Sequence, residues 1–214
     1  MKQQIKRIIV YLIGLWILSL GVAVSVKSGL GVTSVNSIPY ALSLIFSADM
    51  GLFTAGLYIV FVLIQALLLR RKFPKRYLLE IPCSVLFGEM VDLSNLLLTL
   101  LPDPSHYILR LLLLAASILL VASGVYLYCQ TNLIPLPGDG VILALAETCN
   151  IKFHTVKILF DCVLVVISAI ISMIFLHGLV SVREGTVISS ILIGTVVGVL
   201  PKLFGKRSAG VKSQ

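Results

Sequence analysis

Charged residues are scarce in this chain. They make up 12% of the 214 residues, whereas hydrophobic residues make up 58%. In a soluble domain, about a quarter of all residues are charged. Together with a mean hydropathy of +1.08, this scarcity excludes an ordinary soluble domain and indicates a chain with a lipid-facing surface.

The sequence also lacks the spacings typical of metal, redox and hydrolytic sites. Its four cysteines show no CxxC spacing, and three of them fall within or at the edges of apolar runs, where a free cysteine behaves as a small hydrophobe. Its three histidines are dispersed along the chain. No GxSxG, HExxH or P-loop pattern occurs. We therefore predict no enzymatic activity, no catalytic residues, no cofactor and no metal site.

Long apolar runs are what the chain has instead. Each is long enough, or nearly so, for a helix to cross about 30 Å of hydrocarbon. The first has basic flanks but no small-residue cleavage site, so we interpret it as a retained span. The six runs are Ile5–Val26, Leu52–Leu69, Tyr77–Leu101, Ile108–Tyr128, His154–Leu176 and Val187–Leu200.

The net charge of +8 is concentrated in three basic clusters. These lie before the first run, at residues 70–76, and after the last run, from Lys202 onward. The positive-inside rule places all three in the cytoplasm, which predicts six spans with both chain ends on the cytoplasmic side. No aromatic-interleaved basic patch accompanies the charge, so we predict no nucleic-acid partner.

The chain aligns with itself at an offset of 103 residues (124 − 21). The stretch GVAVSVKSGLGVTSVNSIPYALS from Gly21 then falls on GVYLYCQTNLIPLPGDGVILALA from Gly124, pairing Asn36 with Asp139. We predict a single membrane domain over 1–214, with repeat 1 at about 5–102, repeat 2 at about 107–203 and a basic cytoplasmic tail at 204–214. Because each repeat has an odd number of spans, the fold class is an all-α polytopic membrane protein with six transmembrane helices in two inverted three-helix repeats.

Each repeat also contains a breaker cluster and a short apolar segment, Val35–Phe46 and Val141–Thr148. About 12 residues at 1.5 Å each span about 18 Å, too little to cross. TSVNS and PLPGDG are typical helix starts, with Ser, Thr, Asn or Asp as candidate caps and glycine and proline in the preceding turn. The short helices are re-entrant or interfacial. If they are re-entrant, inversion brings their N-termini, with Asn36 and Asp139, within reach of one small ligand.

The stretches GLGVTSVNSIPYALS and PLPGDGVILALA, with HTVKILFD and GEMVDL, resemble the repeated motif of the YczE/YyaS/YitT family of bacterial integral membrane proteins. The likeness covers roughly Ile5 to Leu203. It departs at Ser34, where many members carry proline, and at Ile134, where glycine is common. The resemblance implies a small multi-pass protein of the bacterial plasma membrane and names no substrate.

Ionisable residues inside spans are functional candidates. Glu89 and Asp92 lie near the middle of the third run on one helical face, and we predict that they face the protein interior. There an ionised carboxylate either pairs with a cation, with Lys157 as the candidate, or holds a proton that exchanges for substrate. Glu80, near the cytoplasmic end, is expected to reach interfacial water or Lys75 and is predicted to be structural. Lys157 and Asp161 have the spacing of a helical ion pair, and a structural or a functional role stays open.

These features predict a small secondary transporter, permease or exporter of a small polar solute, coupled to protons. The alternative is a non-transporting membrane scaffold or accessory subunit of a partner enzyme or exporter. The expected partners are the lipid bilayer and a small polar solute or ion, while a homo-oligomer or a partner membrane protein stays open. The candidate binding or coupling residues are Glu89, Asp92, Asn36, Ser34, Asp139, Lys157 and Asp161.

Overall fold

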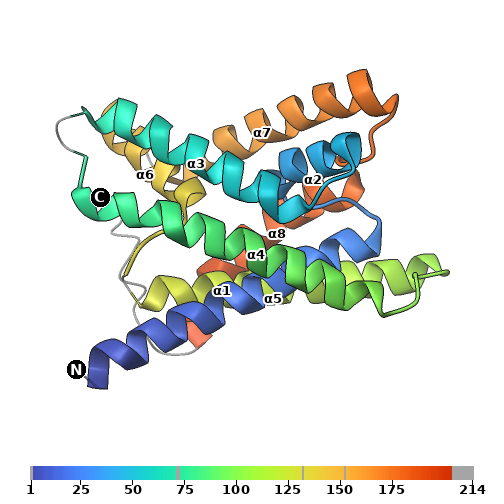
Figure 1. Cartoon of the computed structure of the whole chain (residues 1–214), viewed down its shortest axis with the longest axis horizontal. Helices are drawn as coiled ribbons and strands as arrows, with labels where there is room; N and C mark the ends of the chain where they lie inside the picture. Colours follow the sequence, from blue (N-terminus) through green and yellow to red (C-terminus); the bar gives the residue numbers. More distant parts are fainter. Residues whose placement is uncertain (1, 71–72, 132, 152, 204–214) are drawn as a thin grey trace. The chain divides into compact units, whose positions relative to one another are not determined.

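The computed structural model describes residues 2–70, 73–131, 133–151 and 153–203 (Figure 1). The predicted basic tail at 204–214 lies outside these residues. All regular secondary structure in the described part of the chain is helical, as predicted. The elements are α1 (Lys2–Ser28), α2 (Ser34–Phe46), α3 (Met50–Leu69), η2 (Lys75–Leu79), α4 (Glu80–Thr99), α5 (Tyr107–Gln130), α6 (Pro137–Cys149), α7 (Phe153–Leu176) and α8 (Glu184–Leu203).

Helix lengths recur in the same order in the two halves of the chain. The first four helices have 27, 13, 20 and 20 residues, and the second four have 24, 13, 24 and 20. This is the predicted order of long span, short helix, span and span. The short helices α2 and α6 are therefore confirmed as elements of 13 residues, about 20 Å long.

Five helices are long and apolar enough to cross a membrane: Gln3–Ser28, Met50–Leu69, Tyr77–Thr99, Tyr107–Gln130 and Thr155–Leu176. They match the first five predicted spans. The sixth, Val187–Leu200, falls on α8, where the apolar stretch among the described residues is the shorter Glu184–Ile193, so a sixth crossing stays a prediction. Large apolar side chains are widely exposed, Leu67 and Leu100 among them, as expected of helices that face lipid.

The chain divides into two compact units that do not coincide with the two predicted repeats. Unit 1 comprises Met1–Thr33, Leu93–Leu133 and Glu184–Gln214, and unit 2 comprises Ser34–Asp92 and Ile134–Arg183. Unit 1 thus holds α1, α5, α8 and the end of α4, whereas unit 2 holds α2, α3, α6, α7 and the start of α4. Each unit takes helices from both repeats.

In unit 1, glycines let the backbones of α1 and α5 touch. A Cβ on Gly21 would lie 2.7 Å from the nitrogen of Val121, and one on Gly124 would lie 2.6 Å from the nitrogen of Leu18. Gly14 likewise faces the carbonyl of Gly124, so the two helices run antiparallel. At the offset of 103, Gly21 corresponds to Gly124 and Leu18 to Val121. The contact is therefore reciprocal between equivalent positions.

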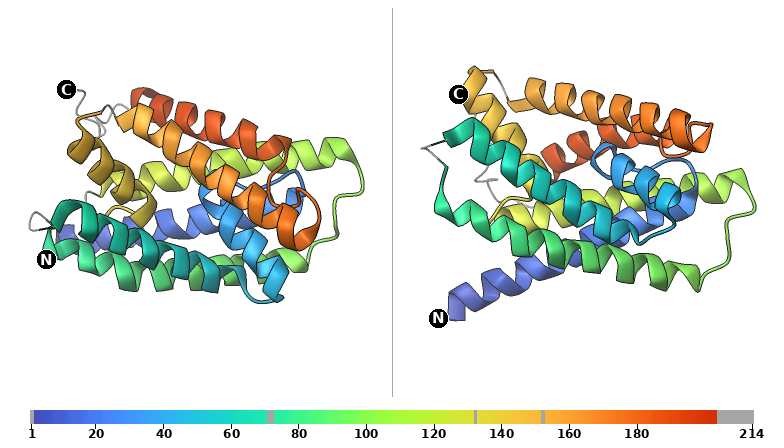
Figure 2. Two further views of the ribbon diagram at one scale, coloured as in Figure 1. Left: turned by 90° about the horizontal axis from the view of Figure 1, so that it is seen from above. Right: turned by 45° about the horizontal axis from the view of Figure 1, so that its top comes forward.

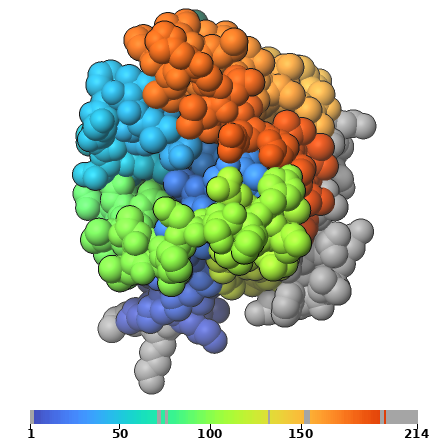
Figure 3. Space-filling model, turned by 90° about the vertical axis from the view of Figure 1, so that its right-hand side faces the viewer, coloured from blue at the N-terminus to red at the C-terminus, as the bar shows by residue number. Residues whose placement is uncertain are grey.

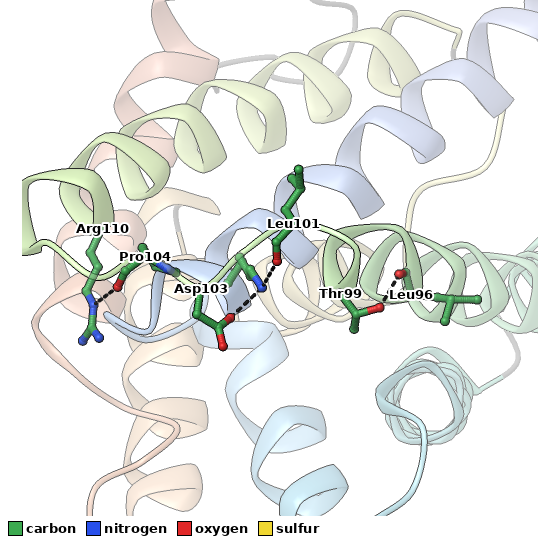
Figure 4. Close-up of polar contacts among 7 residues, drawn as sticks. Leu96, Thr99, Leu101, Asp103, Pro104 and Arg110 are labelled. Carbon is green, nitrogen blue, oxygen red and sulfur yellow. Dashed lines mark hydrogen bonds and ion pairs between the residues drawn. The ribbon is translucent and has the colours of Figure 1, made fainter.

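The connection between α4 and α5 is held by two basic side chains of unit 1 (Figure 4). Lys27 Nζ donates to the carbonyl of Leu101 at 2.8 Å and pairs with Asp103 Oδ1 at 2.6 Å. Arg110 Nε donates to the carbonyl of Pro104 at 3.2 Å. The hydrogen bond and charge of Lys27 lower the pKa of Asp103 below its usual value.

In unit 2, both short helices pack on both α3 and α7. They lie toward opposite ends of these long helices in each ribbon view (Figures 1 and 2). Figure 3 shows α2, in light blue, beside the C-terminal part of α7, in orange. The most extensive contacts of α2 are with α7 and those of α6 are with α3, so each short helix packs chiefly on a long helix of the other repeat.

The start of α6 differs from the sequence prediction. The helix begins at Pro137 rather than Val141, and its N-cap is Leu136, with no side-chain cap bond, so the predicted polar cap is wrong. Proline fits the first turn because its missing N–H has no partner to lose there. Asp139 lies in this first turn, where the helix dipole favours a negative charge. The helix ends at Asn150, whose φ of 54° is the left-handed conformation common at such ends.

Candidate functional site

The two short helices begin close to one another inside unit 2. A Cβ on Gly138, in the first turn of α6, would lie 3.8 Å from Cγ1 of Val35, in the first turn of α2. From there the helices extend toward opposite ends of α3 and α7 (Figure 2). Two polar clusters surround these helix starts, one at each short helix, and together they form the candidate site.

The α2 cluster is an ion pair joined to a hydroxyl. Ser34, the first residue of α2, donates from Oγ to Asp161 Oδ1 at 2.9 Å. The other oxygen of Asp161 lies 3.4 Å from Nζ of Lys157, one turn earlier on α7. Ser34 and Asp161 are buried, and Lys157 is partly exposed. The structure thus joins three of the predicted site residues, and the predicted pair of Lys157 with Asp161 forms.

The α6 cluster is built around two fully buried side chains. Gln65 on α3 donates from Nε2 to Glu80 Oε2 at 2.8 Å and to the carbonyl of Pro137 at 3.1 Å. Both Gln65 and Glu80 have 0% of their surface exposed. Among the described residues, neither Oε1 of Gln65 nor Oε1 of Glu80 has a hydrogen-bond partner. The first turn of α6 is therefore tied to α3 and α4 through one amide.

A glycine makes room for this amide. A Cβ on Gly140 would lie 2.6 Å from Gln65 Oε1 and 2.7 Å from its Nε2, closer than side-chain atoms approach one another. Glycine at this position lets the Gln65 carboxamide lie directly against the α6 backbone. The PGDG sequence thus makes room for the Gln65 carboxamide as well as starting a helix.

The two predicted partners at the helix starts are both in unit 2. Asn36 is buried in the first turn of α2. Asp139 is half-buried in the first turn of α6 and lies near enough to Glu80 and Tyr58 for electrostatic interaction. The acids of this cluster, Glu80 and Asp139, are thus close together.

Aromatic rings pack within the same unit. Tyr58 stacks on Phe87 at 5.7 Å between ring centroids and on Phe61 at 6.1 Å, and Phe61 packs on Phe160 at 5.3 Å. These rings join α3, α4 and α7.

Glu89 and Asp92 do not form the predicted inward-facing pair. Glu89 is exposed, so its predicted orientation toward the protein interior is wrong. Asp92 is half-buried, and its Oδ1 accepts a 2.5 Å hydrogen bond from the backbone nitrogen of Gly51 in the first turn of α3. This bond satisfies a helix N-terminus, which is a structural role. Nearby, Gly51 and Gly88 bring the backbones of α3 and α4 together.

Sequence reasoning missed Gln65 and the burial of Glu80. Glu80 was expected to reach interfacial water or Lys75, but it is fully buried. The signal was Gln65 itself, which is the one side-chain amide in the apolar helix α3. A search of the described residues finds no group of three or more His, Cys, Asp or Glu that could hold a metal ion.

The helices described above, five of them apolar and of membrane length, define an all-helical membrane protein. The model of DUF6198, a family of unknown function, matches residues 5–202, and the chain belongs to this family. No curated protein and no solved structure matches the chain.

Proposed function

We propose that the protein is a small secondary transporter of a small polar solute, with its binding site at the starts of α2 and α6. The observation that carries the proposal is the convergence of two short helices beside buried polar side chains within an apolar unit. Non-helical backbone at membrane depth persists only where it is buried in protein or lines a wet cavity. Discontinuous helices whose N-termini meet at a central site are a recurring construction of secondary transporters.

The proposal includes six crossings in two inverted repeats, with both short helices re-entrant. Three observations support it. The contact of α1 with α5 is antiparallel and reciprocal, each short helix packs chiefly on a long helix of the other repeat, and α2 and α6 run in opposite directions. The basic clusters support cytoplasmic ends in a bacterial plasma membrane, and the resemblance to the YczE/YyaS/YitT family fits the same arrangement. Cysteine labelling should then find positions 104 and 184 external and position 72 cytoplasmic. An external position 72 would contradict the topology.

The charges favour a solute that carries a positive group. At the α2 cluster the carboxylate of Asp161 is already paired with Lys157. At the α6 cluster, Glu80 has no ion pair with any described cation, and Asp139 adds a second acid. An amine or a zwitterion fits this balance, because the helix N-termini can hold an anionic group while the acids hold the cationic one.

Uptake into liposomes tests the proposal. The purified protein, reconstituted with an inward proton gradient, is screened against labelled amines and amino acids. We expect saturable uptake of one class, reduced at least tenfold by Asp139→Asn and unchanged by Glu147→Gln, an exposed acid near the end of the same helix. Absence of uptake in every arm, with stable co-purification of one membrane partner, would favour the scaffold function instead.

A further inference from the structure

Glu80 is a buried acid, and no side chain that the structure describes forms an ion pair with it. Its Oε2 accepts from Gln65 Nε2, and its Oε1 is buried without a partner. The charge of Asp139 on α6, which acts on it electrostatically, is negative. On α7, Lys157 is engaged with Asp161. An ionised carboxylate in such surroundings is costly, so a bound positive charge would stabilise Glu80.

The unpartnered atoms indicate which positive charge fits. Gln65 Oε1 and Glu80 Oε1 are both hydrogen-bond acceptors, and each belongs to a planar group whose other heavy atom already joins the pair at 2.8 Å. Two oxygens are too few for a hard metal cation, which takes about six. One hydrogen between two such oxygens would satisfy both of them.

We propose that Glu80 and Gln65 form a proton-binding pair. A proton taken from water binds Oε1 of the Glu80 carboxylate, and the resulting acid donates its O–H to Gln65 Oε1 while Gln65 Nε2 continues to donate to Glu80 Oε2. Two hydrogen bonds then join the acid and the amide. When the proton departs, the Glu80 carboxylate becomes negatively charged. That this proton is the coupling ion of the transporter rests on the proposed function, whereas proton binding itself does not.

The position of the pair connects proton and solute. Gln65 also donates to the carbonyl of Pro137, and its amide lies against Gly140. Loss of the proton would leave two acceptors facing each other, which repel. The amide would then turn, and the first turn of α6, where Asp139 lies, would lose its hydrogen bond to α3. Proton release therefore changes the solute site directly.

Infrared difference spectroscopy of the purified protein in lipid nanodiscs tests proton binding without any transport. Exposed glutamates, with a pKa of about 4.3, are ionised at pH 7. We expect a carboxylic-acid carbonyl band at pH 7 that shifts in heavy water, is absent in Glu80→Gln and is retained in Glu147→Gln. A missing band, or one that survives Glu80→Gln, would overturn the proposal.

A second variant tests the pairing itself. Gln65→Leu removes the amide, so the acid carbonyl should lose a hydrogen bond and its band should move to higher frequency. An unmoved band would show that Gln65 does not hold the acid. This variant also covers the case in which Glu80→Gln fails to fold. If the bands behave as expected but every uptake screen is negative, proton binding stands and the transport proposal fails.

Discussion

The starts of α2 and α6 occupy equivalent positions in the two repeats, yet their polar clusters are built differently. Ser34 corresponds to Pro137 at the offset of 103 residues. At α2 a side-chain hydroxyl contacts an acid on α7, and that acid is paired with Lys157. At α6 a backbone carbonyl contacts an amide on α3, and that amide holds Glu80 of α4.

The difference lies in charge compensation. The repeat partner of Asp161 is Tyr58 (161 − 103), a neutral residue that stacks on Phe61 and Phe87. The acid of the second cluster therefore comes from another helix and has no cation beside it among the described residues. Under the proposed proton binding, the α2 cluster keeps a fixed charge balance, whereas the α6 cluster changes its charge when a proton binds. We therefore call the α2 cluster the static end and the α6 cluster the switchable end.

The largest effect on stability is expected at the switchable end, from Gly140→Ala. The added Cβ would push the Gln65 amide away and break its bonds to Glu80 and to Pro137, which should cost about 2–4 kcal/mol in free energy of unfolding. Gly138→Ala is the matched control, because its nearest neighbour would be 3.8 Å away. Thermal unfolding in detergent, followed by the single tryptophan, measures both. Equal stability of the two variants would contradict the close packing of the amide.

A smaller effect is expected at the static end, from Lys157→Met. This change leaves Asp161 buried with Ser34 as its remaining partner and should cost about 2 kcal/mol, between the values of exposed and buried ion pairs, since Lys157 is 30% exposed. Adding Asp161→Asn should recover most of the loss.

Glu80→Gln should by contrast change stability by less than about 0.5 kcal/mol, because an amide offers the same donor and acceptor as the protonated acid. The same unfolding experiment compares Lys157→Met, its combination with Asp161→Asn, and Glu80→Gln. If Lys157→Met left the free energy of unfolding unchanged while Glu80→Gln lowered it, the assignment of the static and switchable ends would be reversed.

The smallest effect is expected outside the membrane helices, at Asp103. Lys27 lowers the pKa of this acid from 3.8, so its contribution to stability is present above that unfolded value and is lost as the pH falls through the lower folded value. Asp103→Asn should therefore reduce the difference in unfolding temperature between pH 5 and pH 2, and leave the two polar clusters unaffected. An identical pH profile for wild type and variant would show that the pair adds no stability.

The sequence predicted the helices well because their physical signals are local. Apolar runs such as Leu52–Leu69 have a length fixed by the bilayer, and they recur as α3 with bounds shifted by two residues or fewer. Glycine and proline clusters marked both short helices. The start of α6 was placed four residues late, because Pro137 and Gly138 were treated as a turn when they form the first helical turn.

The site was only partly predictable, because a helix that is apolar on all sides has no polar–apolar periodicity to mark its inward face. Depth along α4 favoured Glu89, whereas rotation about the helix axis exposes it and buries Glu80. Lys157 and Asp161 were found because their spacing is a local helical rule. The partner of Glu80 is Gln65, 15 residues away on α3, and Gln65 also binds Pro137, 72 residues away on α6, at separations that no periodicity encodes.

Because each unit contains helices from both halves of the chain, neither unit can fold completely before the second half is synthesised. Neither half of the sequence holds the components of a finished core, since α1 lacks α5 and α2 lacks α7 until the second half is made. During synthesis, the first four helices must wait in the membrane with their glycine-lined and polar surfaces open. An ancestral half-length chain could have closed those surfaces only with a second copy of itself.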